Sequence, residues 1–291
     1  MDKNLFSKLF VILKIRFLGI QINRSLTGIN QHYGAPINGA APDRVTGGSS
    51  SGSVSLLSSG IVDVATGSDT GGSVRAPASY CGLIGLRTTH GRISLDRTMP
   101  LAPSFDCFGW FAKDAETYRA VGNVVMEPDA DTTPLRRLIG CPELDSLLLG
   151  DDEYMAYAKA CESIEKQFDH ERDFVGLPFD LNTAYWAFRN CQSYEAWQAL
   201  GGWITSRKPD LGPGIKDRFE FGEALTKQEF EKSSGDRLAI RMQLEEMIGD
   251  NGLLVLPTVP SCAPLKAESQ ETLQAFREQA IMLLCLSGLS G

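Results

Sequence analysis

The chain has 291 residues with a net charge of −8, and 43% of its residues are hydrophobic, 22% charged and 9% aromatic. These proportions are ordinary for a globular protein with one large core, and the negative charge argues against nucleic acid and anionic membranes as partners. The seven cysteines are scattered and lack a Cys-x-x-Cys spacing, which favours reduced thiols over disulfides or a metal site. We therefore expect a soluble, cytoplasmic protein that uses neither a metal nor an organic cofactor.

The first 24 residues differ in character from the rest of the chain. Residues 5–20 are apolar, but Lys8, Lys14 and Arg16 interrupt them, and no small-residue cleavage site follows. This segment is too broken to span a bilayer and does not read as a signal peptide. Residues 10–17 have the alternation and β-branched side chains of a strand. A non-native stretch produced by a shifted start is the alternative.

Two glycine–serine turns are the most informative feature of the sequence. Residues 47–53 read GGSSSGS and residues 69–73 read DTGGS. Glycine allows sharp bends and close approach of the backbone, and the successive amides that end at Ser73 can point at one spot, as an oxyanion hole requires. A flexible linker is the alternative, but it does not explain the apolar runs 54–57 and 61–65 between the two turns.

The pattern around these turns resembles the signature of the amidase signature family, which are serine hydrolases with a Ser–cis-Ser–Lys triad. The matching positions are Gly47, Gly48, Ser49, Ser50, Gly52, Gly67, Asp69, Thr70, Gly71, Gly72, Ser73, Arg75 and Pro77, followed by 81–83, 85–87, 90–91 and 106–109. The likeness extends more weakly from about residue 25 to the C-terminus. Within the family, the segments 79–81 and 181–222 resemble most the relatives of indole-3-acetamide hydrolases.

The resemblance implies a role for each matching site residue. Ser73 corresponds to the nucleophile, and Ser49 to the serine that follows a cis peptide bond and relays a proton between the nucleophile and the lysine. The oxyanion-hole donors correspond to the amides of Thr70, Gly71, Gly72 and Ser73. The residues that brace the site by hydrogen bonding correspond to Ser50, Asp69 and Arg75.

Helices and short apolar strands alternate after the signature. We expect helices at 114–125, 151–170, 181–205 and 226–249, and strands at 137–140 and 252–257. Such alternation predicts a layered α/β fold. The resemblance implies a three-layer α/β/α arrangement around a mixed central sheet, in a domain that covers 25–291 after a divergent segment 1–24.

The segment 181–222 contains the chain's aromatic cluster, namely Tyr185, Trp186, Phe188, Tyr194, Trp197 and Trp203. These side chains can form an apolar wall for an aromatic or acyl amide. They can also pack helices against one another, which is the interpretation that we favour.

The family's general base is missing from the pattern. It is a lysine that lies farther upstream of the first serine than the 48 residues available, whereas Lys3, Lys8 and Lys14 are the only lysines before Ser49 and none has a family-like context. No catalytic lysine is identified.

The chain also ends where homologous chains continue, so we expect it to be shortened at both ends, with an incomplete sheet and exposed apolar edges. A naturally short, diverged member is the alternative.

The predicted function is hydrolysis of a small carboxylic amide to an acid and ammonia or an amine through an acyl-serine intermediate. A catalytically impaired fragment or pseudoenzyme without the lysine is the alternative. A Ser–His–Asp hydrolase that pairs Ser73 with His90 or His170 is disfavoured, because no Gly-x-Ser-x-Gly elbow occurs. Self-association into a homo-oligomer is left open.

Overall fold

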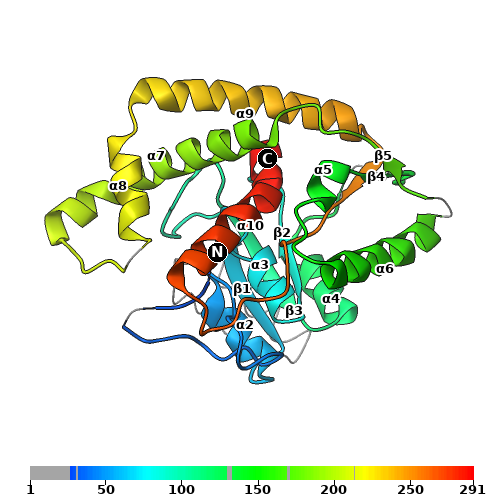
Figure 1. Ribbon diagram of the computed structural model, residues 1–291, viewed down its shortest axis with the longest axis horizontal. Coiled ribbons are helices and arrows are strands. Elements are labelled where there is room, and N and C mark those ends of the chain that lie inside the picture. The colour runs from blue at the N-terminus through cyan, green and yellow to red at the C-terminus, as the bar shows by residue number, and fades with distance from the viewer. Residues whose placement is uncertain (1–26, 31, 130–132, 169–170, 213) are drawn as a thin grey trace.

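The computed structural model describes residues 27–30, 32–129, 133–168, 171–212 and 214–291, and its helices and strands are labelled in Figure 1. The described strands form two sheets of three strands each. The predicted segment 1–24, with its strand at 10–17, lies outside the described residues.

The first sheet is antiparallel, with strand β3 (Cys107–Ala112) between β1 (Val64–Asp69) and β2 (Ile84–Arg87). Gly67 lies opposite Gly109 in the register of β1 and β3. A Cβ atom at Gly109 would lie 2.2 Å from the carbonyl oxygen of Leu86, so the backbones of β2 and β3 approach too closely here for any larger residue.

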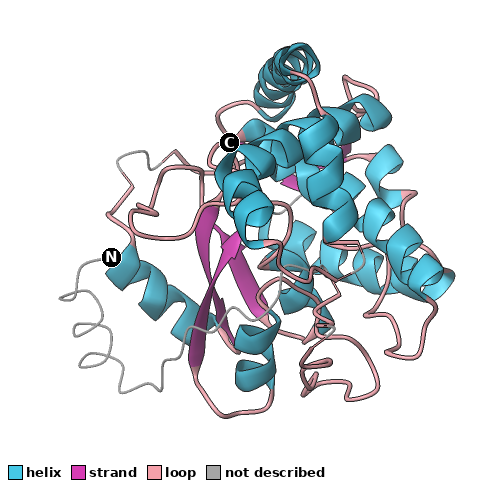
Figure 2. Ribbon diagram, turned by 90° about the vertical axis from the view of Figure 1, so that its left-hand side faces the viewer, coloured by secondary structure: helices cyan, strands magenta, loops and turns pink. Residues whose placement is uncertain are grey.

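Helices cover both faces of this sheet (Figure 2). Helix α2 (Ser51–Ser58) and helix α3 (Arg75–Tyr80) pack on the face that carries Ala65 and Phe111. Helix α4 (Ala115–Val125) packs through Val121 on the opposite face, which carries Val64 and Trp110. Neighbouring residues on a strand point to opposite faces, and the alternation on β1 and β3 therefore builds a three-layer α/β/α unit.

The second sheet is parallel, with β4 (Arg137–Gly140) between β5 (Asp173–Phe174) and β6 (Gly252–Val255). Helix α5 (Pro142–Asp145) and helix α6 (Asp151–Phe168) connect β4 to β5. The predicted α/β class is confirmed. Within the described residues, the antiparallel and parallel strand pairs occur in these two separate sheets, and the outer edges of β1, β2, β5 and β6 carry no further strand.

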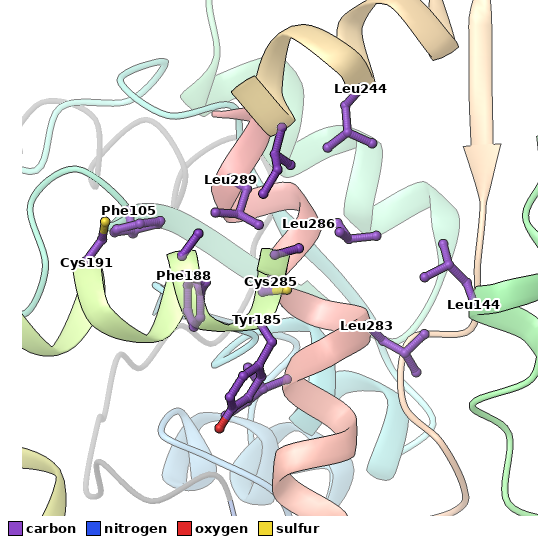
Figure 3. Close-up of a cluster of buried hydrophobic side chains, with 14 of the residues drawn as sticks. Phe105, Leu144, Tyr185, Phe188, Cys191, Leu244, Leu283, Cys285, Leu286 and Leu289 are labelled. Carbon is purple, nitrogen blue, oxygen red and sulfur yellow. The ribbon is translucent and has the colours of Figure 1, made fainter. Parts of the chain in front are cut away.

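Helices α7 (Leu181–Arg207), α9 (Lys227–Ile248) and α10 (Gln270–Ser290) supply most of the largest apolar cluster, which also includes Phe105 and Leu144 of α5 and is shown in part in Figure 3. Helix α8 (Lys216–Ala224) packs against α7 outside this cluster. Polar side chains fix the starts of the three cluster helices: Asp180 caps α7, Thr226 and Glu229 form a capping box at α9, and Ser269 caps α10. Helix α10 passes between α7 and the antiparallel sheet, and thereby reaches the second glycine–serine turn (Figure 1).

The predicted helices and strands agree closely with these elements. The helix expected at 114–125 is α4, whose N-cap Asp114 accepts a hydrogen bond of 2.7 Å from the amide of Thr117. The expected helices 151–170, 181–205 and 226–249 correspond to α6, α7 and α9, and the expected strands to β4 and β6. Helices α8 and α10 are not among the expected elements.

Candidate active site

The first glycine–serine turn packs against helix α3. A Cβ atom at Gly47, whose φ is +71°, would lie 2.6 Å from the Tyr80 ring and 3.0 Å from the Cα of Pro77. Glycine is therefore required at this position. The peptide bond between Gly48 and Ser49 is cis, as the resemblance implies, and Ser49 is buried. Because α3 begins two residues after Ser73, this packing brings the two turns together.

Buried hydroxyl groups gather around the first turn. Within the described part of the chain, the side-chain oxygens of Thr46, Ser50 and Ser51 are buried and have no hydrogen-bond partner. Ser50 also lies so close to β1 that a Cβ atom at Gly67 would be 2.4 Å from its Oγ. The turn therefore holds hydrogen-bonding capacity beside Ser49 that the described residues do not use.

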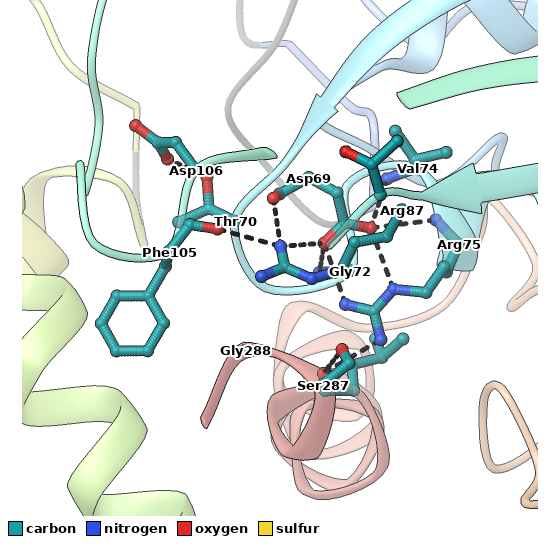
Figure 4. Close-up of polar contacts among 12 residues, drawn as sticks. Asp69, Thr70, Gly72, Val74, Arg75, Arg87, Phe105, Asp106, Ser287 and Gly288 are labelled. Carbon is teal, nitrogen blue, oxygen red and sulfur yellow. Dashed lines mark hydrogen bonds and ion pairs between the residues drawn. The ribbon is translucent and has the colours of Figure 1, made fainter. Parts of the chain in front are cut away.

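Asp69, the last residue of β1, fixes the second turn (Figure 4). Its carboxylate is fully buried and accepts hydrogen bonds from the amides of Gly72 at 2.8 Å, Val74 at 3.1 Å and Arg75 at 3.3 Å. The guanidinium of Arg75 spans both carboxylate oxygens, through Nη2 at 2.9 Å and Nε at 3.1 Å. Such a bidentate pair sets both the position and the orientation of the turn.

A second arginine completes this cluster. Arg87 donates from Nη1 to the backbone oxygens of Asp69 at 2.5 Å and Phe105 at 2.9 Å, and the same nitrogen lies 3.5 Å from the Asp69 carboxylate. Burial alone would raise the pKa of Asp69, but the ion pairs with Arg75 and Arg87 outweigh it and hold the pKa well below its usual range. Asp69 is therefore a constant negative charge beneath the turn.

The four amides of the second turn differ in their hydrogen bonding. The amide of Gly72 is occupied by Asp69, whereas the amides of Thr70, Gly71 and Ser73 have no partner among the described residues. The Thr70 hydroxyl donates to Asp106 at 2.5 Å, which holds the start of the turn from the other side. The turn thus offers three amide donors rather than the four that the sequence suggests.

Two apolar side chains pack directly on the glycines of this turn. A Cβ atom at Gly71 would lie 2.6 Å from the ring of Phe188 on α7, and one at Gly72 would lie 2.4 Å from Leu284 on α10. Gly72 also has a φ of +108°, which side-chain-bearing residues rarely adopt. Helices α7 and α10 therefore form a wall beside Ser73.

The aromatic cluster of 181–222 is divided by the structure. Phe188 belongs to the wall and packs edge-on against Phe105, with 5.2 Å between the ring centres. Tyr194 instead stacks on Phe230 of α9, and Trp203 is 54% exposed. The helix-packing interpretation fits Tyr194. The sequence did not distinguish Phe188 from its neighbours, although its place on the turn makes it part of the site.

Ser73 is half-buried, and its hydroxyl has no hydrogen bond to another described residue. His90 is exposed and its Nε2 lies 2.8 Å from the carbonyl oxygen of Pro103, away from any contact with Ser73. His170, Lys3, Lys8 and Lys14 lie outside the described residues. No group of three or more metal-ligating side chains occurs in the described ranges, and all seven cysteines, each of them described, are free thiols.

Comparison with known proteins identifies this arrangement. A family model described as Amidase matches residues 21–146. A rice protein (Oryza sativa subsp. japonica) named Amidase 1 is 33% identical over 294 residues, which cover 92% of this chain and 68% of the relative. The Amidase 1 of Arabidopsis thaliana is also 33% identical, over 92% of this chain and 70% of the relative.

The chain belongs to the amidase family. A solved structure described as the crystal structure of amidase superposes with a TM-score of 0.80 at 26% identity, covering 93% of this chain and 63% of that one. The matches named amidase place this chain among the hydrolases that act on amide C–N bonds. The chain spans about two thirds of the length of these relatives.

The family resemblance located the two turns, but it gave no role to several residues that shape the site. Arg87 and Asp106 fall on matching positions, and the structure shows both of them holding the start of the second turn, through the backbone oxygen of Asp69 and the hydroxyl group of Thr70. Leu284 comes from a helix more than 200 residues away, and no local pattern indicated its contact with Gly72.

None of the described helices is long and apolar enough to cross a membrane.

Proposed function

We propose that this family member hydrolyses a carboxylic amide to the acid and ammonia or an amine, with Ser73 as the nucleophile. The observation that carries the proposal is the second turn. Asp69 fixes it through the amide of Gly72 and leaves the amides of Thr70, Gly71 and Ser73 without partners. Preorganised amide donors beside a nucleophile are what an acyl-transfer transition state requires.

The proposed reaction has two stages. The Oγ of Ser73 attacks the carbonyl carbon, and the three free amides of the turn stabilise the negative charge that develops on the carbonyl oxygen. Ser49 passes the proton of Ser73 to the leaving nitrogen as the C–N bond breaks. Water then attacks the acyl-Ser73 ester, which releases the carboxylic acid and restores the hydroxyl group.

The bracing residues do not touch the substrate in this scheme. Asp69 and Arg75 hold the turn in place, and Ser50 packs the first turn against β1. Their contribution is geometric, because an oxyanion hole stabilises charge only when its donors are fixed before the reaction. The substrate is a small amide, and none of these steps uses a cofactor.

The test is the replacement Ser73→Ala, with Ser79→Ala as the matched control. Ser79 is an exposed serine on α3, six residues along the chain. We expect Ser73→Ala to abolish labelling by a fluorophosphonate and to lower amide turnover by about 10³-fold or more, because the nucleophile and its proton relay act as a unit. Ser79→Ala should retain both activities. Unchanged turnover in Ser73→Ala would remove Ser73 from the mechanism.

A further inference from the structure

A second cluster of charges lies between helices α7, α8 and α10. Its centre is the carboxylate of Glu278 on α10, which accepts hydrogen bonds from Arg277 at 2.6 Å and from the hydroxyl group of Tyr185 on α7. Arg189, one turn after Tyr185, places its Nη1 3.7 Å from the same carboxylate. This is an ion pair, but the distance is too long for a hydrogen bond.

A third arginine adds to this group from α8. Arg218 donates from Nε to the carbonyl oxygen of Gly214 at 2.7 Å. Burial, together with repulsion from Arg277 and Arg189, lowers the pKa of Arg218 well below its usual value. Burial also lowers the pKa of Arg277 to about 10, despite the nearby Glu278. The guanidinium carbon of Arg189 lies 5.8 Å from the ring centre of Phe221, which follows Arg218 by three residues on α8, so the three guanidinium groups lie in one region.

The positive charge of this cluster is not balanced by the described residues. Glu278 is the carboxylate in contact with Arg189 and Arg277, and the other acid that acts on Arg218 is the exposed Asp217. The side chain of Arg277 is 7% exposed, yet its Nε–H has no hydrogen-bond partner, and the buried Nη1 of Arg189 also lacks one. Buried donors of this kind are costly unless an acceptor satisfies them.

The position of the cluster relates it to Ser73. Arg277 and Leu284 lie seven residues apart on α10, which is two turns on the same face and about 10 Å along the axis. Leu284 packs on Gly72, and on α7 Tyr185 precedes the Phe188 that packs on Gly71 by about one turn. Figure 3 shows the hydroxyl group of Tyr185 pointing away from the apolar cluster. Arg277 and Tyr185 thus lie on the two helices that pack on the second turn, about two turns and one turn from the residues that contact it.

We propose that Arg189, Arg218 and Arg277 bind a carboxylate group of the amide substrate, so that the preferred substrates are monoamides of dicarboxylic acids. A carboxylate supplies two oxygen acceptors for the guanidinium groups that lack them and neutralises the excess charge. Tyr185 and Glu278 hold the arginines in place. This assignment rests on the proposed hydrolysis at Ser73, because it places the amide of the same molecule at the second turn.

The first experiment measures hydrolysis. The monoamides of glutaric and adipic acid are compared with pentanamide and hexanamide, which have the same chain lengths without the carboxylate. We expect kcat/KM to favour the charged amides by about 10-fold to 100-fold, since a hydrogen-bonded charge in a buried site contributes this much. Arg189→Gln should reduce that preference. Arg241→Gln, at an exposed arginine paired with Glu245 on α9, should retain it.

The second experiment measures binding without turnover. Glutarate is titrated calorimetrically into the Ser73→Ala chain, with and without Arg189→Gln, and we expect the second replacement to weaken binding about tenfold. Arg189 makes no side-chain hydrogen bond to another described residue, so its removal should leave the fold intact. Equal affinity in the two chains, or equal hydrolysis of neutral and charged amides, would overturn the carboxylate assignment and leave the role of Ser73 standing. Turnover by Ser73→Ala would overturn the proposed function instead. The calorimetric titration of glutarate would then still test the carboxylate assignment.

Discussion

Two clusters of arginine and carboxylate lie beside helix α10, and they differ in how well their charges are matched. Asp69 is fully buried, and its carboxylate accepts hydrogen bonds from three backbone amides and from Nε and Nη2 of Arg75. Glu278 is 28% exposed, and the guanidinium groups around it have N–H donors left over. Among the described residues, the Asp69 cluster leaves one buried donor without a partner, Nη2 of Arg87, although its carboxylate is saturated. The Glu278 cluster leaves two, Nε of Arg277 and Nη1 of Arg189, around a carboxylate that is partly exposed.

This difference separates two uses of an arginine–carboxylate ion pair. A saturated carboxylate such as Asp69 holds a segment of backbone in place, because its oxygens are fully used by amides and a guanidinium group of the chain. A cluster with unsatisfied buried donors is instead suited to a group that arrives from outside. The first kind should therefore show itself mainly in stability, and the second mainly in substrate preference.

The largest effect on stability is expected from Asp69→Asn. The replacement leaves the guanidinium groups of Arg75 and Arg87 buried without their counter-charge, and breaking a buried pair in this way costs about 3–5 kcal/mol. Urea unfolding of both chains measures the loss. The control is Asp173→Asn on β5, whose ion pair with Arg137 is exposed and should be worth less than about 1 kcal/mol. Similar losses in the two variants would contradict the bracing role of Asp69.

A smaller loss of stability is expected from Gly72→Ala. The added methyl group would meet Leu284 at 2.4 Å, and a φ of +108° is strained for alanine, so we expect a loss of about 1–3 kcal/mol. Gly235→Ala is the control, because that position lies within helix α9 with open space around it. It should stabilise the chain by about 0.5–1 kcal/mol in the same unfolding measurement. A neutral Gly72→Ala would mean that the wall of α10 can move away from the turn.

The pH dependence of stability provides a further test of the Asp69 cluster. The pKa of Asp69 is lowered in the folded chain, so its contribution is fully present above the unfolded pKa of about 4 and is lost as the pH falls below that value. We expect the urea midpoint to fall on acidification below about pH 4. The fall should be less steep in Asp69→Asn, which has no proton to bind there. Parallel profiles for the two chains would assign the acid sensitivity to other carboxylates.

The sequence predicted the parts of the site that are local. The turns at 47–53 and 69–73 depend on a spacing of glycine and serine that the sequence shows directly. Asp114 marks the start of α4 by its capping position. The number of usable amides was not visible, because it depends on Gly72 bonding to Asp69 rather than to a substrate. Spacing shows which donors are present, but it does not show which are already taken.

The parts of the site that come from distant segments could not be predicted. Arg189, Arg218 and Arg277 lie on three helices, and each one alone resembles an ordinary charged residue on a helix surface. Helix α8 has an acidic and aromatic mixture without a clear apolar stripe, which explains why it was missed. The excess of charge exists only after α7, α8 and α10 have packed together.

The smallest effect is expected from replacing the three lysines that precede Ser49. Ser73 needs a base to lose its proton, and a lysine can serve only if it is neutral and held close to Ser49. Lys3, Lys8 and Lys14 have no family-like sequence context. In the proposed mechanism, the amide donors of the turn that Asp69 holds still provide a residual rate without a base. We therefore expect slow turnover and slow fluorophosphonate labelling by this chain, both unchanged when the three lysines are replaced together by methionine.

The measurement is the labelling rate of Ser73 between about pH 6 and pH 10, where a lysine base would give a rise as it becomes neutral. The matched control replaces Lys216, Lys227 and Lys232, exposed lysines on α8 and α9 whose partners are acids one helical turn away. Loss of labelling in the N-terminal variant alone would show that one of its lysines is the base, and single replacements would then identify it. Equal rates in both variants would leave the oxyanion donors and Ser49 as the source of the activity, because neither set of replacements touches the turn that Asp69 holds.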